Sequence, residues 1–130
     1  MVPNIVAVMA ESRALLNYCW RLDGAIDERT RLDRTEREIV QMAANMENNC
    51  TYCMATHTVA AKMDGVPDQV IEAMRANRRL GNAKLDALHD LARDMVASRG
   101  WPEQENVDVL LPPATTRTRW SRSLPRSPSR

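Results

Sequence analysis

The sequence of 130 residues contains no phenylalanine and only four glycines, and aromatic residues make up 4% of it. A core must therefore be built from aliphatic side chains and from the eight methionines. So few glycines leave little material for the tight turns of β-hairpins, and no useful stretch alternates apolar with polar residues. A chain of this length holds one domain. The sequence predicts an all-α protein, a compact antiparallel helical domain of about five helices.

Long apolar runs and a secretion signal are also missing. No run approaches the roughly 18–20 apolar residues that cross a bilayer, and the first residues lack the basic, apolar and small-residue order of a signal peptide. Three cysteines, Cys19, Cys50 and Cys53, are too few and too unevenly spaced for a secreted disulfide scaffold. We therefore expect a cytoplasmic protein with no membrane partner and with thiols that can be reduced.

The net charge of +1 is the sum of an acidic region and a basic region. Residues 111–130 contain five arginines, no acidic residue and four of the seven prolines, so residues 1–110 keep 13 basic and 17 acidic residues. We expect a folded domain over 1–110 and a basic Pro/Ser/Arg-rich tail over 111–130, either disordered or out of frame. Because only this tail could attract phosphates, we predict no nucleic-acid partner.

Helix signals follow one another along residues 11–102. An apolar stripe predicts a helix from about Glu11 to Leu22 with Gly24 as its stop. The expected later boundaries are a capping box of Asp33 and Glu36, an interruption at Asn48 and Asn49, a helix stop at Gly65, a first-turn Pro67, a cap at Asn82 and a stop at Gly100, Trp101 and Pro102.

The most informative segment is the helix expected to begin near Cys50. At about 100° per residue, Cys50, Cys53 and His57 fall at about 0°, 300° and 340°, on one narrow face. Unpaired backbone N–H groups at a helix start stabilise a thiolate, and a Cys-x-x-Cys pair can close a disulfide within one turn. The three side chains therefore offer a nucleophile, a resolving thiol and a base.

Other interpretations of the same residues compete with this one. Each cysteine, or the histidine, taken alone is more often a structural residue. A zinc site would need a fourth ligand, and only Cys19 or His89 remains to supply it. We therefore expect neither a metal nor a cofactor, and we expect Cys19 to serve in core packing.

Glu38 adds a carboxylate twelve residues before Cys50, on the preceding helix. The pattern Glu38-x11-Cys50-x2-Cys53-x3-His57 resembles the signature of the alkylhydroperoxidase D-like branch of the carboxymuconolactone decarboxylase family. The surrounding segments Val2-Pro3-Asn4-Ile5 and Gly65-Val66-Pro67-Asp68 look alike as well. The resemblance covers residues 2 to about 110.

The resemblance implies an all-helical protein that assembles as a homo-oligomer, a trimer or a multiple of it, and reduces alkyl hydroperoxides. In such proteins Cys53 would be the peroxidatic thiol and Cys50 the resolving thiol, with His57 and Glu38 as a proton relay and an external dithiol or protein reductant. Helix-terminus electrostatics alone would favour Cys50 as the more acidic thiol, so the residues themselves leave the order open. The alternatives are a non-catalytic redox sensor and, further away, a lactone decarboxylase or a zinc module.

The sequence departs from the family pattern in two places. Some relatives carry a second histidine between the cysteines, where this chain has Tyr52, whose phenol titrates near ~10. The family pattern continues beyond Asp108 with a final apolar helix, whereas this chain continues into the basic tail. A frameshift that replaced this last helix is the hypothesis, and the coding DNA tests it.

Overall fold

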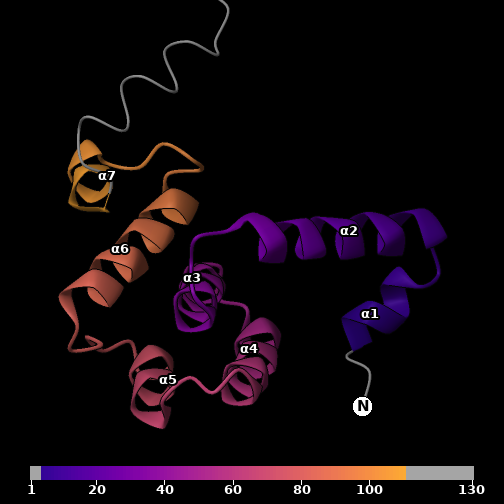
Figure 1. Cartoon of the computed structure of the whole chain (residues 1–130), viewed down its shortest axis with the longest axis horizontal. Helices are drawn as coiled ribbons and strands as arrows, with labels where there is room; N and C mark the ends of the chain where they lie inside the picture. The colour runs from indigo at the N-terminus through magenta and orange to yellow at the C-terminus, as the bar shows by residue number, and fades with distance from the viewer. Residues whose placement is uncertain (1–3, 111–130) are drawn as a thin grey trace, which may run out of the picture.

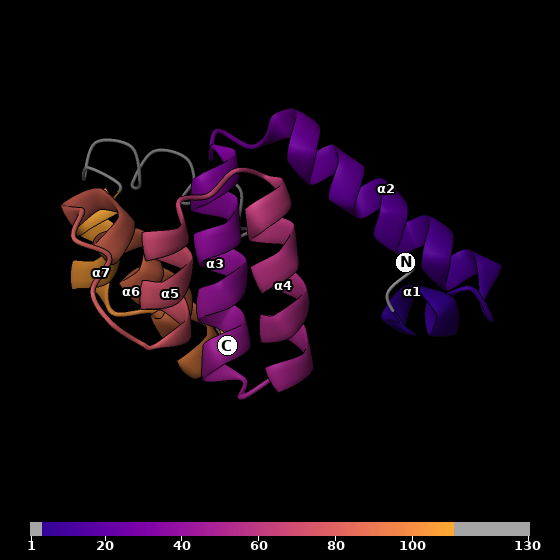
Figure 2. The same ribbon diagram turned by 90° about the horizontal axis from the view of Figure 1, so that it is seen from below.

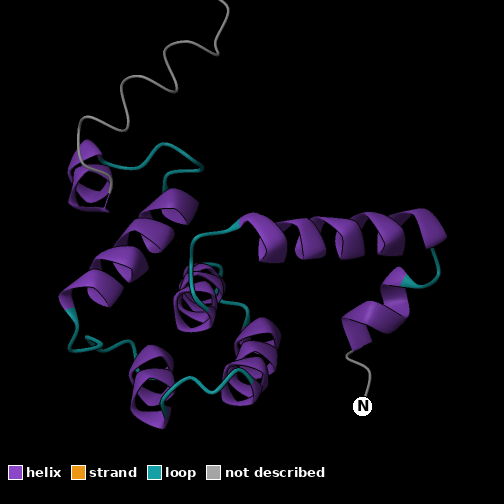
Figure 3. Cartoon of the chain, viewed as in Figure 1, coloured by secondary structure: helices purple, strands orange, loops and turns teal. Residues whose placement is uncertain are grey.

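The computed structural model describes residues 4–110. These residues form seven helices and no strand (Figure 1; Figure 3). The helices are α1 Asn4–Met9, α2 Arg13–Arg29, α3 Arg34–Glu47, α4 Thr51–Met63, α5 Asp68–Arg75, α6 Ala83–Ala97 and α7 Gln104–Leu110. The expected all-α class is confirmed. The predicted tail over 111–130, with its frameshift hypothesis, lies outside the described residues.

The helix boundaries set by local side-chain chemistry are confirmed. The Asp33 carboxylate accepts from the Glu36 backbone N–H while the Glu36 carboxylate accepts from the Asp33 N–H, which completes the capping box of α3. Asn82 caps α6 through its side-chain oxygen, which accepts from the backbone N–H groups of Lys84 and Leu85. Gly65 follows the end of α4 with φ of 77°, a backbone conformation that favours glycine.

Two expectations about the helices are wrong. Gly24 does not end α2, which continues for five residues to Arg29 and stops where Thr30 turns extended. A single glycine inside a helix costs only about 0.5–1 kcal/mol relative to alanine, so it does not end a helix that its other residues stabilise. Pro67 stands at the N-cap of α5 rather than within its first turn. The expected helices are present as α2 to α6, and the described residues add the short helices α1 and α7.

The core lies around α3. Figure 2 shows α3 beside α4, joined by a short turn and antiparallel to it, with α5, α6 and α7 on the other side. The buried side chains of this cluster come from α3, α4, α5, α6 and the turn before α5: Ile39, Met42, Ala43, Ala61, Val66, Val70, Ile71, Met74 and Ala92. This core is aliphatic and rich in methionine, as the composition predicts. It holds α3 and α4 in a fixed relation, which positions the candidate site between them.

The first two helices form an arm that extends away from this core (Figure 1; Figure 2). No residue of α1 or α2 is buried. Asp27 of α2 pairs with Arg37 of α3, and the backbone N–H of Ile5 donates to the Tyr52 hydroxyl of α4 at 3.3 Å. Within residues 4–110 no helix is both long and apolar enough to cross a membrane.

Candidate functional site

The turn between α3 and α4 places the first cysteine at a helix N-terminus. Asn49 takes φ of 53°, a left-handed conformation that asparagine tolerates better than most residues, and this ends the run of α3. Cys50 is then the N-cap of α4, and its Sγ accepts from the backbone N–H of Cys53 at 3.2 Å. The sulfur thus takes the position that a serine or aspartate oxygen usually occupies at a helix start.

Cys50 and Cys53 are joined by a disulfide, with 5.3 Å between their Cα atoms. Both residues are half-buried. When the bond is reduced, the free N–H groups of the first turn of α4 are available to stabilise a thiolate. The structure therefore brings the two predicted cysteines together in a form that thiol exchange can open and close.

His57 and Glu38 meet across the interface between α3 and α4. His57 Nδ1 lies 3.0 Å from Glu38 Oε2, and the Glu38 side chain is only 11% exposed. With the carboxylate ionised, Nδ1–H donates to it, which leaves Nε2 as the basic atom of the ring. His57 lies four residues after Cys53 in α4, so one helical turn separates the second cysteine from the oriented imidazole.

A pocket of about 500 Å³ lies beside this pair. Glu38 and His57 line it, and neither cysteine is among the lining residues that the structure describes. The other walls come from the second half of α2, the connection after it, α3 and the C-cap of α4: Asp23, Ile26, Asp27, Thr30, Leu32, Arg34, Arg37, Val40, Gln41 and Asp64. The imidazole and carboxylate therefore face a space from which protons can exchange with water.

Two contacts near the site have no counterpart in the sequence analysis. Tyr52, between the cysteines, holds the start of α1 through its hydroxyl, and Arg37, next to Glu38, holds α2 through Asp27. Both link residues far apart in the chain, and no local pattern predicts them.

The residues considered as additional zinc ligands lie on other helices. Cys19 is on α2 and keeps a free thiol, at a partly exposed position rather than in the core expected for it. His89 is buried on α6, where its Nδ1 lies 3.0 Å from Asp90 Oδ1. Among residues 4–110 no three His, Cys, Asp or Glu side chains are grouped so that they could hold a metal ion.

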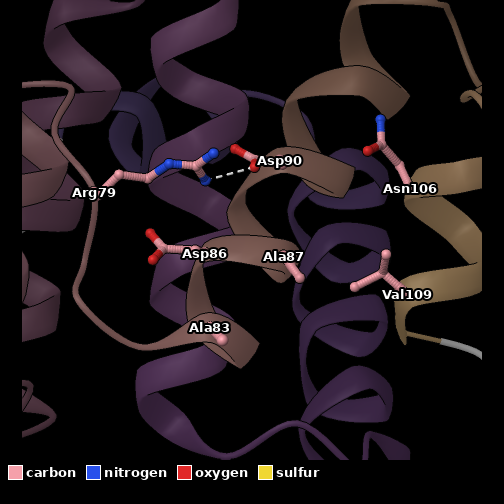
Figure 4. A pocket seen from close by; sticks show the side chains of 7 residues that line it. All are labelled: Arg79, Ala83, Asp86, Ala87, Asp90, Asn106 and Val109. Atoms are coloured by element: carbon pink, nitrogen blue, oxygen red, sulfur yellow. Dashed lines mark hydrogen bonds and ion pairs between the residues drawn. The ribbon is translucent and has the colours of Figure 1, made fainter.

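A second pocket, of about 310 Å³, lies between α6 and α7 (Figure 4). Its charged side chains already have partners: Arg79 Nη1 donates to Asp90 Oδ2 at 2.6 Å, and Asp86 Oδ1 accepts from the backbone N–H of Leu80 at 2.8 Å. The pocket contains neither the cysteines nor the His57–Glu38 pair. Arg79, Asp86 and Asp90 serve the fold of the 79–90 segment, and Asn106 Nδ2 donates to Asp94 Oδ2 at 2.7 Å.

Comparison with models of protein families identifies the family of this chain. No curated protein matches the chain. The sequence model of the carboxymuconolactone decarboxylase family matches residues 13–93, which is more than half of the chain and includes Glu38, both site cysteines and His57. The chain belongs to the carboxymuconolactone decarboxylase family.

Proposed function

We propose that the protein is a thiol-dependent peroxidase of the alkylhydroperoxidase D type. The observation that carries this proposal is the Cys50–Cys53 disulfide at the start of α4, one turn before an imidazole that a buried carboxylate orients. The family also contains decarboxylases, and that activity has no evident use for a closed disulfide. The paired cysteines therefore favour redox chemistry within the family.

In the first step His57 Nε2 accepts the proton of the Cys53 thiol, and the Glu38 carboxylate stabilises the imidazolium. The Cys53 thiolate attacks the terminal oxygen of an alkyl hydroperoxide. An S–O bond forms, the O–O bond breaks, and the leaving alkoxide takes a proton to give the alcohol. Cys53 is oxidised to the sulfenic acid while the peroxide is reduced.

In the second step the Cys50 sulfur attacks the sulfenic sulfur of Cys53. The S–S bond forms, the thiol proton and the hydroxyl leave as water, and the disulfide results. An external dithiol or protein reductant then returns both thiols by exchange and is itself oxidised to a disulfide. The helix start stabilises either thiolate, so the order of the two cysteines rests on the family resemblance.

The proposal also includes the setting of this reaction. We place the protein in the cytoplasm, where reductants keep dithiols available, without a nucleic-acid partner, cofactor or metal. As the resemblance implies, it works as a homo-oligomer. Residues 1–110 are its functional domain.

The test is peroxide consumption by the full chain with tert-butyl hydroperoxide and dithiothreitol. The wild-type protein turns over many times. Cys53→Ser abolishes turnover. Cys50→Ser removes the disulfide route and, after one oxidation in the absence of dithiothreitol, leaves a sulfenic acid on Cys53 that a dimedone probe traps. Cys19→Ser removes a thiol outside the site and leaves the rate unchanged.

Three results would contradict the proposal. One oxidation per chain without turnover identifies a redox sensor instead. Full activity in Cys53→Ser excludes the assigned nucleophile. A dimedone adduct on Cys50 in Cys53→Ser, together with retained single-turnover activity, reverses the two roles.

A further inference from the structure

Helix α3 ends in a Schellman motif, the turn that also ends α4, α5 and α6. The backbone N–H of Cys50 donates to the Asn45 carbonyl at 2.9 Å. The N–H of Asn49, at φ of 53°, donates to the Met46 carbonyl at 3.0 Å. In this motif the side chain of the third-last helical residue commonly contacts that of the second residue after the C-cap. In α3 these residues are Asn45 and Cys50, so the turn brings an amide beside a cysteine of the candidate site.

The other three motifs carry apolar residues at the position of Asn45. At the end of α4 the N–H of Val66 donates to the Ala61 carbonyl at 2.9 Å, and both side chains belong to the buried core. The corresponding residues of α5 and α6 are Ala73 and Met95, whose carbonyls accept at 2.9 and 2.7 Å. The turn itself therefore needs no amide at this position, and the amide of Asn45 has another explanation.

The side-chain nitrogen of Asn45 has no partner within residues 4–110 of the oxidised protein. Nδ2 is buried, and none of the acceptors of these residues lies at hydrogen-bond distance from it. A buried donor without an acceptor destabilises a fold, and alanine at the same position avoids that cost. Because Cys50 is joined to Cys53, the neighbouring sulfur is a weak acceptor in this form. The donor therefore becomes useful where that sulfur turns into a strong acceptor.

We propose that Asn45 stabilises the reduced form of the site by donating from Nδ2 to the Cys50 thiolate. A thiolate carries a full negative charge, and hydrogen bonds to charged groups are shorter and stronger than those between neutral groups. Cys50 Sγ already accepts from the backbone N–H of Cys53 at 3.2 Å, from the α4 side. Asn45 adds a donor from the α3 side, so the thiolate is held between the two helices. The inference rests on the reversible disulfide of the proposed function.

This donor acts when the disulfide is reduced. The thiolate of an external dithiol forms an S–S bond to Cys53 Sγ, the Cys50–Cys53 bond breaks, and the electron pair stays on Cys50 Sγ as a thiolate. The second thiolate of the reductant then attacks this mixed disulfide and releases Cys53, and the reductant becomes a disulfide. Exchange is faster when the leaving thiolate is more stable. Asn45 therefore increases both the rate and the extent of reduction, and it does so through Cys50.

Equilibration of the full chain with mixtures of reduced and oxidised glutathione tests the inference without any peroxide. All samples carry Cys19→Ser, so that every thiol counted by alkylation and mass spectrometry belongs to the site. Asn45→Ala loses the donor and should lower the equilibrium constant for reduction about 3- to 10-fold. Asn45→Asp keeps the size of the side chain, places a negative charge beside the thiolate and should lower the constant further. Asn48→Ala removes an exposed amide from the same turn and should change it by less than about twofold.

Urea unfolding of both redox forms separates this role from a purely structural one. Asn45→Ala should leave the oxidised protein at least as stable as the wild type, because it removes an unpaired donor, and should make the reduced protein less stable. Equilibrium constants within about twofold of the wild type in both Asn45 variants overturn the inference, and so does an equal fall in Asn48→Ala. Peroxide turnover is measured on the same samples. If the wild type reduces no peroxide while the Asn45 effect remains, only the proposed function is wrong.

Discussion

His57 Nδ1 lies 3.0 Å from Glu38 Oε2, across the contact between α4 and α3. Nineteen residues separate the two in sequence, and the antiparallel packing of their helices around Ile39, Met42 and Ala61 brings them together. A buried carboxylate that accepts an imidazole N–H fixes the tautomer and the orientation of the ring. The contact thus fixes the orientation of the His57 ring one helical turn after Cys53 on α4.

Replacing Glu38 by glutamine tests the importance of this carboxylate. The variant keeps the size of the side chain but removes the charge that stabilises an imidazolium. We expect turnover of tert-butyl hydroperoxide to fall about 10- to 100-fold, the usual effect of losing a residue that orients a functional histidine.

Glu36→Gln provides the matched control. Glu36 is also buried and lies on the same helix, but it serves the capping box, which glutamine supports as well, and an ion pair with Lys84. Its loss should leave the rate per folded molecule unchanged. Equal losses in Glu36→Gln and Glu38→Gln would mean that the buried charge acts on folding alone.

Sequence and structure agree best where the signal is local. Asp33 and Glu36 identify the start of α3 because both halves of the capping box lie within four residues, and Asn82 identifies the start of α6 for the same reason. The wrong end of α2 has a physical cause too. Gly24 costs less free energy than the neighbouring residues of α2 contribute to helix stability. The helix ends instead where the backbone of Thr30 becomes extended.

The candidate site was predictable in part. Helical spacing alone places Cys50, Cys53 and His57 on one face, but Glu38 joins them only if α3 and α4 are antiparallel and in register, which the sequence suggested through a family resemblance. The contacts that α1 and α2 make with the other helices could not be predicted from the sequence. The Asp27–Arg37 and Ile5–Tyr52 pairs depend on the orientation of α2 relative to α3, which the connection at residues 30–33 sets. No local sequence pattern encodes that orientation.

The contact between Tyr52 and Ile5 predicts a change in the N-terminal helix. Tyr52→Phe removes the hydroxyl that accepts the Ile5 N–H and nothing else. Since one such hydrogen bond contributes about 0.5–1.5 kcal/mol, hydrogen–deuterium exchange at the Ile5 amide should become about 2- to 10-fold faster. Tyr18→Phe removes a hydroxyl from α2 and should leave that amide unaffected. Unchanged exchange in Tyr52→Phe would show that α1 is held in place by other contacts.

Two methionines test the location of the core. Met74 of α5 is 1% exposed and Met63 at the end of α4 is 81% exposed. Met74→Ala leaves a cavity and should lower the free energy of unfolding by about 2–5 kcal/mol, measured by urea denaturation. Met63→Ala should change it by no more than about 0.5 kcal/mol. A cost at Met63 equal to that at Met74 would show that the end of α4 is covered in solution.

The His89–Asp90–Arg79 cluster predicts a pH dependence of stability. Burial raises the pKa of Asp90, but hydrogen bonds from His89 and Arg79 outweigh it, and the net result is a pKa below the usual value of 3.8. A carboxylate with a lowered pKa in the folded state contributes stability at pH values above its unfolded pKa. That contribution is lost as the pH falls through the folded pKa. Asp90→Asn should therefore lower the melting temperature at pH 7, and the difference from the wild type should shrink below about pH 4.

Asp108→Asn is the comparison for that experiment, because Asp108 is exposed on α7 and its one side-chain partner within residues 4–110 is the neutral Gln104, which donates at 2.8 Å. Its melting temperature should follow the wild type across the whole pH range. If the difference in melting temperature between Asp90→Asn and the wild type stays constant down to pH 2, the charge of Asp90 contributes nothing to the stability of the fold. The cluster would then stabilise the 79–90 segment through hydrogen bonds that an amide also makes.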